Sequence, residues 1–511
     1  MQLLCQLRRY SSWLISRMAG AQGAPEMEAT RDNLATICAT VNSGFEHLAT
    51  QECVEKFTSA ARPRQVKKFR GRILFEIPYQ EVKQVSQLRS VDNLSVLVGH
   101  FTQIDFSSQD KEAAVNTICQ KIEMGNWKHA LDTWQIFTGS EFCLDPLPKS
   151  LSKPQSSEAK QSTSDEEDGG GDDGAGGDGG GEAGATAPRP TFRVTCTRSG
   201  ERHHFNSRDV APSVGSLINE TYGWPVKMKD YDLEVVVNVL EDSMLVALSM
   251  TKESMHRRNI THFGVTTLRS TIAYCMLRMT QPQPGEIICD PMCGVGAIPL
   301  EGLLAWRSCL VMSGDVNEVA VERTKGNIDS LTEKRKSKQI IRPDLPNDVF
   351  RWDVTNLPLK SASIDVFVTD LPFGKRMGSR RNNWSLYRQC LEEMARVCRP
   401  KTSRAVLLTQ DKKCMAQTLQ RCGHLWRKKN FVFINHGGLK ACVYLLQRAK
   451  EKEGKRKHEG DDESDSKAAA MGSDEGDDVE DDVEDDQDQG CEGKHDSGQE
   501  RERTTEQKET T

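Results

Sequence analysis

A glycine-containing loop follows the apolar run 287–289 and Asp290, and it is the first stretch whose residue types could do chemistry. Glycine permits a tight turn and a close approach of a ligand to the backbone, and the helix that follows offers free N–H groups. This is not the three-glycine pattern of a dinucleotide site, because Ala297 and Leu300 stand where further glycines would be. An acidic Asp290 suits a ligand that carries positive charge. We therefore predict contacts to S-adenosylmethionine at Asp290, Cys293, Gly294 and Gly296.

Two further acids follow later strand-like runs. Asp315 closes the run 309–315 and could accept both hydroxyls of a ribose, with Asn317 as a helper. Asp353 follows the run 348–352 and could accept from an adenine amino group. Each acid alone could equally be a helix cap or a turn residue. Acids in register with several strand ends favour a cofactor site over unrelated caps.

The hexapeptide 369–374 follows another apolar strand and could hold an amine. An amine on an aromatic ring is a poor nucleophile because its lone pair is delocalised. A carboxylate at Asp370 and a carbonyl held by the following proline can accept both N–H bonds, while Phe373 stacks on the ring. An ordinary turn with a buried phenylalanine is the alternative. We predict metal-free methyl transfer to a nucleobase amine, with catalytic residues Asp370, Leu371, Pro372 and Phe373.

Basic residues stand next to these loops. They follow the hexapeptide directly and also precede the region of alternating strands and helices. A rim that faces phosphates would explain them, and a solvated loop is the simpler alternative. The predicted RNA-binding residues are Arg257, Arg258, Lys375, Arg376 and Arg380.

Charge is distributed unevenly along the 511 residues. The formal net charge is −6, but residues 151–190 carry −6 and residues 451–511 carry −15, which leaves +15 on the remainder. A basic remainder favours a polyanionic partner such as RNA, although cationic surfaces also aid solubility. The sixteen cysteines include no C-x-x-C pair, so we expect reduced thiols and no zinc site. No apolar run approaches the eighteen residues of a membrane span, so we expect no membrane association.

The elements that must position the two loops alternate between strand and helix from Glu286 onward. Such alternation over about 190 residues predicts a mostly parallel, doubly wound sheet. A late antiparallel pair would suit the methyltransferase variant of that sheet. An amphipathic helix at 265–280 is expected to precede it. The predicted strands are 286–290, 309–315, 348–352, 364–369, 404–409, 429–434 and 440–446.

The preceding region predicts smaller α+β units. Strands at 34–41, 72–77 and 95–101, with helices at 44–56 and 82–88, give a β-α-β-α-β order that is ferredoxin-like in outline. A helical region at 110–136 follows. The Gly- and Asp-rich residues 150–190 cannot bury a core and predict a flexible tether. Beyond it we expect a strand at 192–197, a helix at 208–220 and a hairpin at 233–250.

Three motifs carry a resemblance to a known family. Residues 257–264, 290–302 and 368–379 look like the corresponding motifs of the THUMP-domain tRNA guanine-N2 methyltransferases, and the resemblance covers roughly 35–140 and 190–447. It implies an enzyme that makes N2-methylguanosine in the tRNA acceptor stem, at position 6, with a THUMP domain that grips the tRNA. It also implies a heterodimer with a small zinc-binding methyltransferase activator subunit. The insert, the acidic tail and the N-terminal leader depart from the family pattern.

Pattern and resemblance together predict the domain organisation. The fold class is α/β, with a Rossmann-like class I methyltransferase domain preceded by ferredoxin-like and THUMP domains. The expected parts are a disordered leader (1–30), the ferredoxin-like domain (31–106), the THUMP domain (107–252) with a disordered interruption (145–190), the methyltransferase domain (253–449) and a disordered acidic tail (450–511).

Other functions and the location stay open on the sequence. An adenine-N6 methyltransferase acting on RNA or DNA is one alternative, although Leu371 and Phe373 replace the Pro-Tyr usual in adenine enzymes. A non-enzymatic RNA-binding protein is another, but a decayed site would have lost some of its acids. Residues 1–25 contain three arginines and no acid, so they could be a mitochondrial presequence. We favour an unstructured extension and a cytoplasmic protein, with nuclear or mitochondrial location as alternatives.

Overall fold

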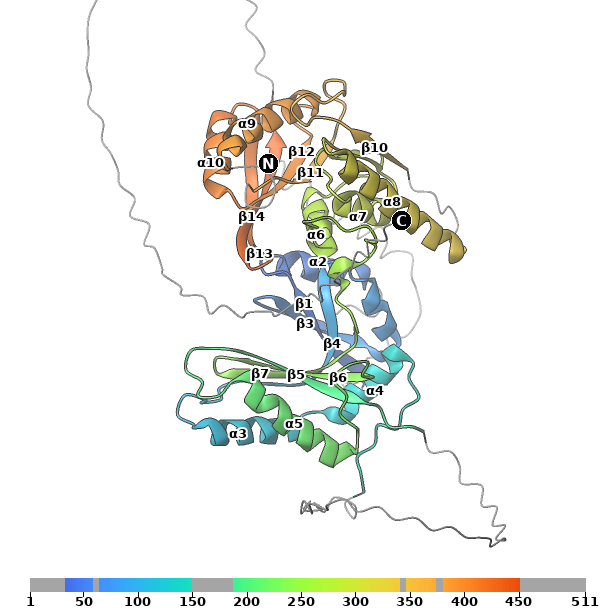
Figure 1. Ribbon diagram of the computed structural model, residues 1–511, viewed down its shortest axis with the longest axis vertical. Coiled ribbons are helices and arrows are strands. Elements are labelled where there is room, and N and C mark those ends of the chain that lie inside the picture. The colour runs from blue at the N-terminus through green and yellow to red at the C-terminus, as the bar shows by residue number, and fades with distance from the viewer. Residues whose placement is uncertain (1–32, 58–63, 149–186, 341–345, 374–379, 451–511) are drawn as a thin grey trace, which may run out of the picture. The chain divides into compact units, whose positions relative to one another are not determined.

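The computed structural model describes residues 33–57, 64–148, 187–340, 346–373 and 380–450. In these residues the chain forms two seven-stranded sheets with helices packed against them (Figure 1). The predicted α/β class is confirmed. The predicted leader, almost all of the predicted acidic tail and most of the predicted insert lie outside the described residues.

The first sheet joins the two smaller units predicted before the catalytic region. Its strand order is β2-β3-β1-β4-β7-β6-β5. The junction is antiparallel pairing of β4 with β7, and only β5 and β6 run parallel to each other. The strands are β1 (Leu34–Val41), β2 (Arg64–Phe69), β3 (Arg72–Pro78), β4 (Val91–Phe101), β5 (Phe192–Ser199), β6 (Leu233–Leu240) and β7 (Ser243–Ser249).

Two elements at the start of this sheet differ from the sequence-based expectation. The sequence does not predict β2, because the segment RQVKKF lacks the apolar alternation of a half-buried strand. β2 is an edge strand that pairs only with β3, so it needs little apolar surface. The expected short α-helix is a 3₁₀ helix, η2 (Tyr79–Gln87), that buries Val82 and Val85. Their three-residue spacing fits the three residues per turn of a 3₁₀ helix.

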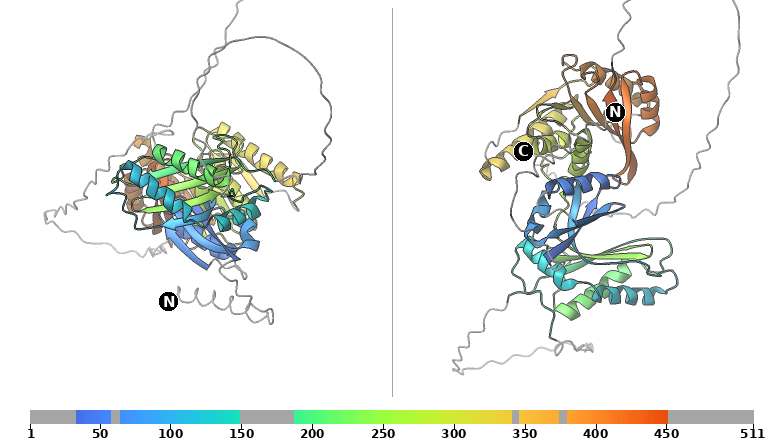
Figure 2. Two further views of the ribbon diagram at one scale, coloured as in Figure 1. Left: turned by 90° about the horizontal axis from the view of Figure 1, so that it is seen from below. Right: turned by 180° about the vertical axis from the view of Figure 1, so that it is seen from behind.

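Helices pack against the first sheet, and the residues that cap their N-termini can be read from the sequence. The helical region expected at 110–136 is two helices, α3 (Lys111–Glu123) and α4 (Trp127–Thr138). They are separate because the Asn126 side chain accepts a hydrogen bond from the His129 N–H and starts a new helix. Helix α5 (Ser207–Tyr222) begins at a capping box of Asn206 with Asp209. Figures 1 and 2 show α3 and α5 side by side on one face of the sheet.

The second sheet has the predicted doubly wound form. Its order is β10-β9-β8-β11-β12-β14-β13. The first five strands in this order are parallel to one another, β14 is antiparallel to β12, and β13 is antiparallel to β14. The predicted late antiparallel pair is confirmed. The strands are β8 (Ile287–Asp290), β9 (Leu310–Asp315), β10 (Asn347–Arg351), β11 (Val366–Asp370), β12 (Arg404–Thr409), β13 (Trp426–His436) and β14 (Leu439–Arg448).

Helices lie on both faces of this second, catalytic sheet. Those on one face bury residues such as Ile272, Leu300 and Ile328, and those on the other bury residues such as Leu391 and Met415. The first group is α6 (Ser270–Thr280), α7 (Ala297–Ala305) and α8 (Glu318–Ser337), and the second is α9 (Arg380–Val397) and α10 (Lys412–Arg421). None of the helices in the described ranges has the length and apolar character to cross a membrane.

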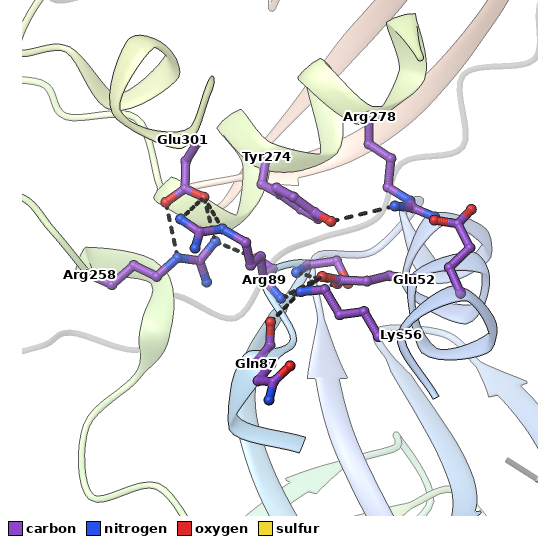
Figure 3. Close-up of polar contacts among 10 residues, drawn as sticks. Glu52, Lys56, Gln87, Arg89, Arg258, Tyr274, Arg278 and Glu301 are labelled. Carbon is purple, nitrogen blue, oxygen red and sulfur yellow. Dashed lines mark hydrogen bonds and ion pairs between the residues drawn. The ribbon is translucent and has the colours of Figure 1, made fainter. Parts of the chain in front are cut away.

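A buried ion-pair cluster joins α7 of the catalytic sheet to the first sheet (Figure 3). The Glu301 carboxylate is fully buried and pairs with Arg258 at 3.0 Å and with Arg89 at 2.8 Å. Arg258 also donates to the backbone carbonyl of Arg89 at 2.6 Å. Burial raises the pKa of Glu301, but the two guanidinium groups outweigh it and hold that pKa below its usual value. Glu301 is therefore ionised and fixes the two parts to each other.

A second buried carboxylate extends the same contact (Figure 3). Glu52 of α2 (Glu46–Lys56) accepts from the backbone N–H groups of Arg89 and Ser90, each at 2.9 Å, and pairs with Lys56 at 2.7 Å. The guanidinium of Arg278 on α6 pairs with Glu55 at 2.6 Å. Helix α2 thus fixes the backbone at Arg89, whose side chain pairs with Glu301.

Candidate active site

Three acidic residues end neighbouring strands at one edge of the catalytic sheet. Asp315, Asp290 and Asp370 are the last residues of β9, β8 and β11, which are adjacent and parallel. Because the carboxyl ends of parallel strands meet at one edge, these side chains share the end of the sheet where α/β folds bind ligands. The structure thus brings the two predicted loops together.

The loop between β8 and α7 has a backbone that requires its glycines. Gly294 has φ of +55° and Gly296 has φ of +88°, both in the left-handed region. A Cβ added at Gly296 would lie 2.9 Å from Cγ2 of Thr324 in α8. A Cβ added at Gly294 would have no described atom within 4 Å. One side of the loop is therefore pressed against α8, and the other is open to an approaching ligand.

Two polar residues of α8 that sequence reasoning missed hold this loop. The Thr324 hydroxyl donates to the Gly294 carbonyl at 3.0 Å. The buried Asn327 amide donates to the Val295 carbonyl at 2.8 Å and to the His262 carbonyl at 3.0 Å. Asn327 thereby ties the loop to the 257–264 motif. A signal was present, because both residues interrupt the apolar stripe of α8 with polar groups that must find partners once buried.

Cys293 and Asp315 also support the loop. The Cys293 N–H donates to the Gly314 carbonyl at 2.9 Å, and its sulfur lies 3.5 Å from the Thr324 hydroxyl. The Asp315 carboxylate accepts from the N–H groups of Gly294 at 3.0 Å and Asn317 at 2.9 Å. Asp315 thus positions the loop with oxygens that each keep further acceptor capacity.

The remaining predicted cofactor residues lie at turns. Asn317, predicted from the sequence as a helper in ribose binding, caps α8 by accepting from the Val319 N–H at 3.0 Å. Asp353 follows β10, is exposed, and accepts from the N–H and hydroxyl of Thr355, each at 2.8 Å. Both residues lie beyond the carboxyl ends of their strands, on the ligand side of the sheet.

Two of the three strand-end carboxyl groups, those of Asp290 and Asp370, are shifted towards their neutral forms. Burial raises the pKa of Asp290 to about 7. Burial, and after it the neighbouring Asp290 carboxylate, raises the pKa of Asp370 well above its usual range. The Asp370 Oδ1 atom is shielded from solvent and has no hydrogen-bond partner among the described residues. A buried acceptor without a donor costs folding free energy, so this oxygen is the expected contact of a ligand that donates a hydrogen bond.

The backbone of the target loop, residues 370–373, is anchored on both sides of Leu371. The Leu371 N–H donates to the Leu408 carbonyl at 3.0 Å. The buried Tyr387 hydroxyl donates to the Pro372 carbonyl at 2.9 Å and lies 2.8 Å from the Thr409 hydroxyl. The half-buried Phe373 ring meets His436 edge to face, with ring centroids 6.2 Å apart. The bond from Tyr387 spans 15 residues of sequence, and nothing local in the sequence reveals it.

The predicted RNA-binding residues differ in how the structure places them. Arg257 is exposed, with its guanidinium 5.9 Å from the Phe263 ring centroid. Arg258 is half-buried and is engaged with Glu301, so it has a structural role whatever else it contacts. Lys375 and Arg376 lie outside the described residues, and Arg380 is the first residue of α9.

This arrangement defines a class of enzyme. A doubly wound sheet with a terminal antiparallel pair, a glycine loop after its first strand and an acidic loop after its fourth is the pattern of the class I methyltransferases, whose methyl donor is S-adenosylmethionine. The residues fit that cofactor, because the open face at Gly294 admits a ligand and the carboxylates beside it suit a cation. The described residues hold no cluster of three His, Cys, Asp or Glu side chains that would suit a metal.

Known proteins agree with this class. A family model described as an RMKL-like methyltransferase domain matches residues 257–441, and a THUMP domain model matches residues 182–249. The tRNA (guanine(6)-N(2))-methyltransferase THUMP3 of Mus musculus is 42% identical over 453 residues, which cover 81% of this chain and 89% of that protein. The Homo sapiens protein of the same name is 41% identical over 458 residues, with 82% and 89% covered.

The fold also matches solved structures. TrmN from Thermus thermophilus superimposes with a TM-score of 0.56 at 19% identity, covering 81% of this chain and 99% of that one. SMU.472, a putative methyltransferase complexed with SAH, gives 0.55 at 15% identity, with 82% and 100% covered. The chain belongs to the THUMP-domain tRNA guanine-N2 methyltransferase family, as the sequence motifs predict. It is an S-adenosylmethionine-dependent methyltransferase.

Binding of S-adenosylmethionine is expected to tighten as the pH rises from 6 to 8. In the free chain Asp290 has a pKa of about 7, so it is largely protonated at pH 6 and ionised at pH 8. A sulfonium cation favours the ionised carboxylate, so binding should release a proton. Below that pKa, Kd should fall by up to about tenfold for each pH unit of increase. Titration calorimetry in buffers of different ionisation enthalpy measures both effects. Asp290→Asn should flatten the profile, and a pH-independent Kd for the unaltered chain would contradict the expectation.

Tyr387→Phe is expected to lower kcat for methyl transfer by about tenfold, because it removes the hydrogen bond that fixes the Pro372 carbonyl. The ring and its packing are kept, so KM for tRNA and Kd for S-adenosylmethionine should stay unchanged. Steady-state kinetics and calorimetry test this. Tyr444→Phe is the matched control, because Tyr444 is a buried tyrosine of the same core whose hydroxyl does not bond the loop. Equal losses in both variants would assign Tyr387 a packing role alone.

Proposed function

We propose that this enzyme forms N2-methylguanosine at position 6 of tRNA, in the acceptor stem. The observation that carries the proposal is the shielded, unpartnered Asp370 oxygen beside the cofactor loop. An exocyclic amine supplies the hydrogen-bond donor that this oxygen lacks. The choice of guanine and of position 6 is supported by the names of the relatives that share 41–42% identity with the chain.

The cofactor is proposed to lie across the carboxyl ends of β8, β9 and β10. Asp315 would accept from the ribose hydroxyls while it keeps its bonds to the loop, and Asp353 would accept from the adenine amino group. Asn317 would stay a helix cap at the edge of the site. Asp290, with Cys293, Gly294 and Gly296, would form the wall on which the cationic amino-acid part rests. S-adenosylmethionine supplies an electrophilic methyl group there.

The target base is proposed to lie between Phe373 and the cofactor, in a loop that prepares its amine. The Asp370 carboxylate accepts one N–H bond and the Leu371 carbonyl accepts the other, because Tyr387 already occupies the Pro372 carbonyl. Both contacts direct the nitrogen lone pair at the methyl carbon. Transfer of the methyl group would release the donor as its neutral thioether and would leave N2 with a proton to give up. Asp370, whose pKa is raised by burial, is the group placed to take that proton.

The other parts of the chain are proposed to bring the tRNA. Residues 31–106 form the ferredoxin-like domain and residues 107–252 the THUMP domain, which grips the acceptor end. The methyltransferase domain is 253–449, and Arg257 and the basic residues after the target loop face phosphates. We place the enzyme in the cytoplasm.

A small zinc-binding activator subunit is proposed as a heterodimer partner. Apolar side chains at the β10 edge of the catalytic sheet support it: Val316, Val319 and Phe350 are 65%, 48% and 38% exposed. They lie near one another, because Arg351 beside Phe350 donates to the Val316 carbonyl at 3.3 Å. Exposed apolar groups at an open sheet edge favour a partner that covers them.

Nucleoside mass spectrometry tests the assignment directly. The full chain, alone and with the activator, is incubated with S-adenosylmethionine and unmodified tRNA, which is then digested and analysed. N2-methylguanosine that maps to position 6 is the expected product. N6-methyladenosine would replace this proposal with the adenine alternative, and absence of any methylated nucleoside in both incubations would favour the RNA-binding one.

A further inference from the structure

The hairpin of β2 and β3 carries cations that form no ion pair with a carboxylate of the described residues. We call Lys67, Lys68, Phe69, Arg70 and Arg72 the basic hairpin. Its two lysines and Arg70 are exposed, and Arg72 is half-buried. Within the described ranges none of its four cations lies within ion-pair distance of an acidic side chain. Unpaired cations gathered on one short element are the electrostatic signature of a surface that binds a polyanion.

Neighbouring histidines feel the positive field of this hairpin. Burial lowers the pKa of His100, and Lys67 and Arg72 lower it further. Burial also lowers the pKa of His47, and Lys68 adds to that effect. The charges therefore act on their surroundings, in part against the neighbouring Glu46 carboxylate, which raises the pKa of His47, and a bound anion would relieve them further.

An aromatic ring stands among these charges. Phe69 is 37% exposed and meets His100 edge to face, with ring centroids 5.4 Å apart. Protection of an edge strand against pairing with another chain would account for the lysines of β2. It does not account for an exposed phenylalanine or for an arginine in the turn. Cations interleaved with an exposed ring suit a nucleic acid, whose backbone and bases they can contact together.

The hairpin is fixed to the catalytic sheet through one short loop. The Glu46 carboxylate accepts from the Gly71 N–H in the hairpin turn at 2.7 Å and from the Gly44 N–H at 2.9 Å. Gly44 packs so closely on β13 that an added Cβ would lie 2.1 Å from the Phe433 carbonyl oxygen. The hairpin turn and β13 therefore share a rigid support.

The same support leads to the target loop. The Asn42 side chain donates to the Asn435 carbonyl at 2.9 Å, and the next residue, His436, contacts Phe373. Beside β13 a cation again lies next to an exposed ring, since the Lys412 ammonium of α10 lies 5.3 Å from the centroid of the 56% exposed Phe433 ring. A series of direct contacts thus runs from the basic hairpin to the residue proposed to stack on the target base.

We propose that the basic hairpin binds the sugar-phosphate backbone of the substrate RNA while the target base occupies the loop at Asp370. The proposal rests on the function proposed above. It places an RNA contact in the N-terminal part of the first sheet, outside the matched THUMP region.

The test is a charge-neutral variant of the full chain, Lys67→Gln/Lys68→Gln/Arg70→Gln. Its affinity for an unmodified tRNA transcript is measured by fluorescence anisotropy at several KCl concentrations. We expect roughly 10- to 100-fold weaker binding near 100 mM salt, and a salt slope smaller by about 2 to 3, as for the loss of up to three phosphate contacts. KM for tRNA should rise, while kcat at saturating tRNA, Kd for S-adenosylmethionine and Tm stay unchanged. Phe69→Leu should weaken binding by roughly tenfold without changing the slope.

The matched control removes the same charge from exposed lysines of α8 and the turn after it, as Lys325→Gln/Lys334→Gln/Lys338→Gln. It should change the affinity and slope by less than a third of the hairpin effect. If the wild type methylates tRNA and the hairpin variant keeps the wild-type salt slope, the proposal is wrong. The lysines of β2 would then only protect the edge strand. A wild type that methylates no tRNA would instead overturn the proposed function, so the two failures are distinguishable.

Discussion

Asp370→Ala should reduce methyl transfer to tRNA by about a thousandfold or more, while Kd for S-adenosylmethionine changes by less than about threefold. The side chain is proposed to hold the target amine and take its proton, and the cofactor rests on other residues. The variant should also fold. In the free chain the Asp370 Oδ1 atom is shielded from solvent without a described partner, so its removal deletes an unfavourable burial. Single-turnover kinetics, calorimetry and thermal unfolding separate these effects.

Asp370→Asn and Asp365→Asn complete this test. The amide of Asp370→Asn keeps the shape and one acceptor oxygen but cannot take a proton, so its activity should lie between those of wild type and Asp370→Ala. Asp365, just before β11, pairs with Arg399 and accepts from the Ile287 N–H at 3.0 Å. Its asparagine variant should lower Tm with little change in kcat. Equal loss of cofactor binding and turnover in Asp370→Ala would mean that Asp370 shapes the site without taking part in the reaction.

Gly294→Ala should weaken S-adenosylmethionine binding by roughly 10- to 100-fold, because its methyl group would enter the open face of the cofactor loop. Gly296→Ala should mainly destabilise the fold, because its methyl group would lie 2.9 Å from Thr324 Cγ2. Both glycines have positive φ, so each alanine also costs about 1 kcal/mol of backbone strain. Calorimetry for the cofactor and thermal unfolding for the chain should therefore give opposite rankings of the two variants.

A rescue variant makes the contrast between these glycines sharper. Thr324→Ser removes the methyl group that Gly296→Ala would strike and keeps the hydroxyl that donates to the Gly294 carbonyl. Gly296→Ala/Thr324→Ser should recover part of the lost Tm, because the contact with Thr324 Oγ1 at 3.1 Å and the backbone strain remain, whereas Gly294→Ala/Thr324→Ser should recover no affinity. If the two alanine variants lost affinity and Tm in the same proportion, the loop would have no distinct ligand side.

The catalytic half of the fold is predictable because its determinants are local. Apolar runs such as 404–409 match observed strands closely, and acids at Asp290, Asp315 and Asp370 coincide with strand ends. Parallel strands buried on both faces have continuous apolar sequences, and the residue that leaves the sheet is the first that can be polar. The sequence therefore indicates both the sheet and the edge at which the site lies.

The features that the sequence does not reveal depend on partners distant in the chain. Glu301 lies on α7 in a predicted helix, and only the fold shows that Arg89, 212 residues away, completes its ion pair. The Tyr387 hydroxyl meets Pro372 across 15 residues. The sequence does not predict β2 for another reason, because an edge strand with exposed lysines has no alternation of apolar and polar residues to detect. In each case the deciding contact is tertiary.

Pairing of β4 with β7 has a consequence for how the protein is made. β4 ends at Phe101 and β7 begins at Ser243, so about 140 residues must be synthesised before the strand that covers β4 leaves the ribosome. At roughly 5–20 residues per second, that interval is roughly 7–30 s. During it the newly made N-terminal part exposes the apolar edge of β4, which can pair with other chains. We therefore expect the protein to be most exposed to aggregation, and most dependent on chaperones, while the residues between β4 and β7 are being synthesised.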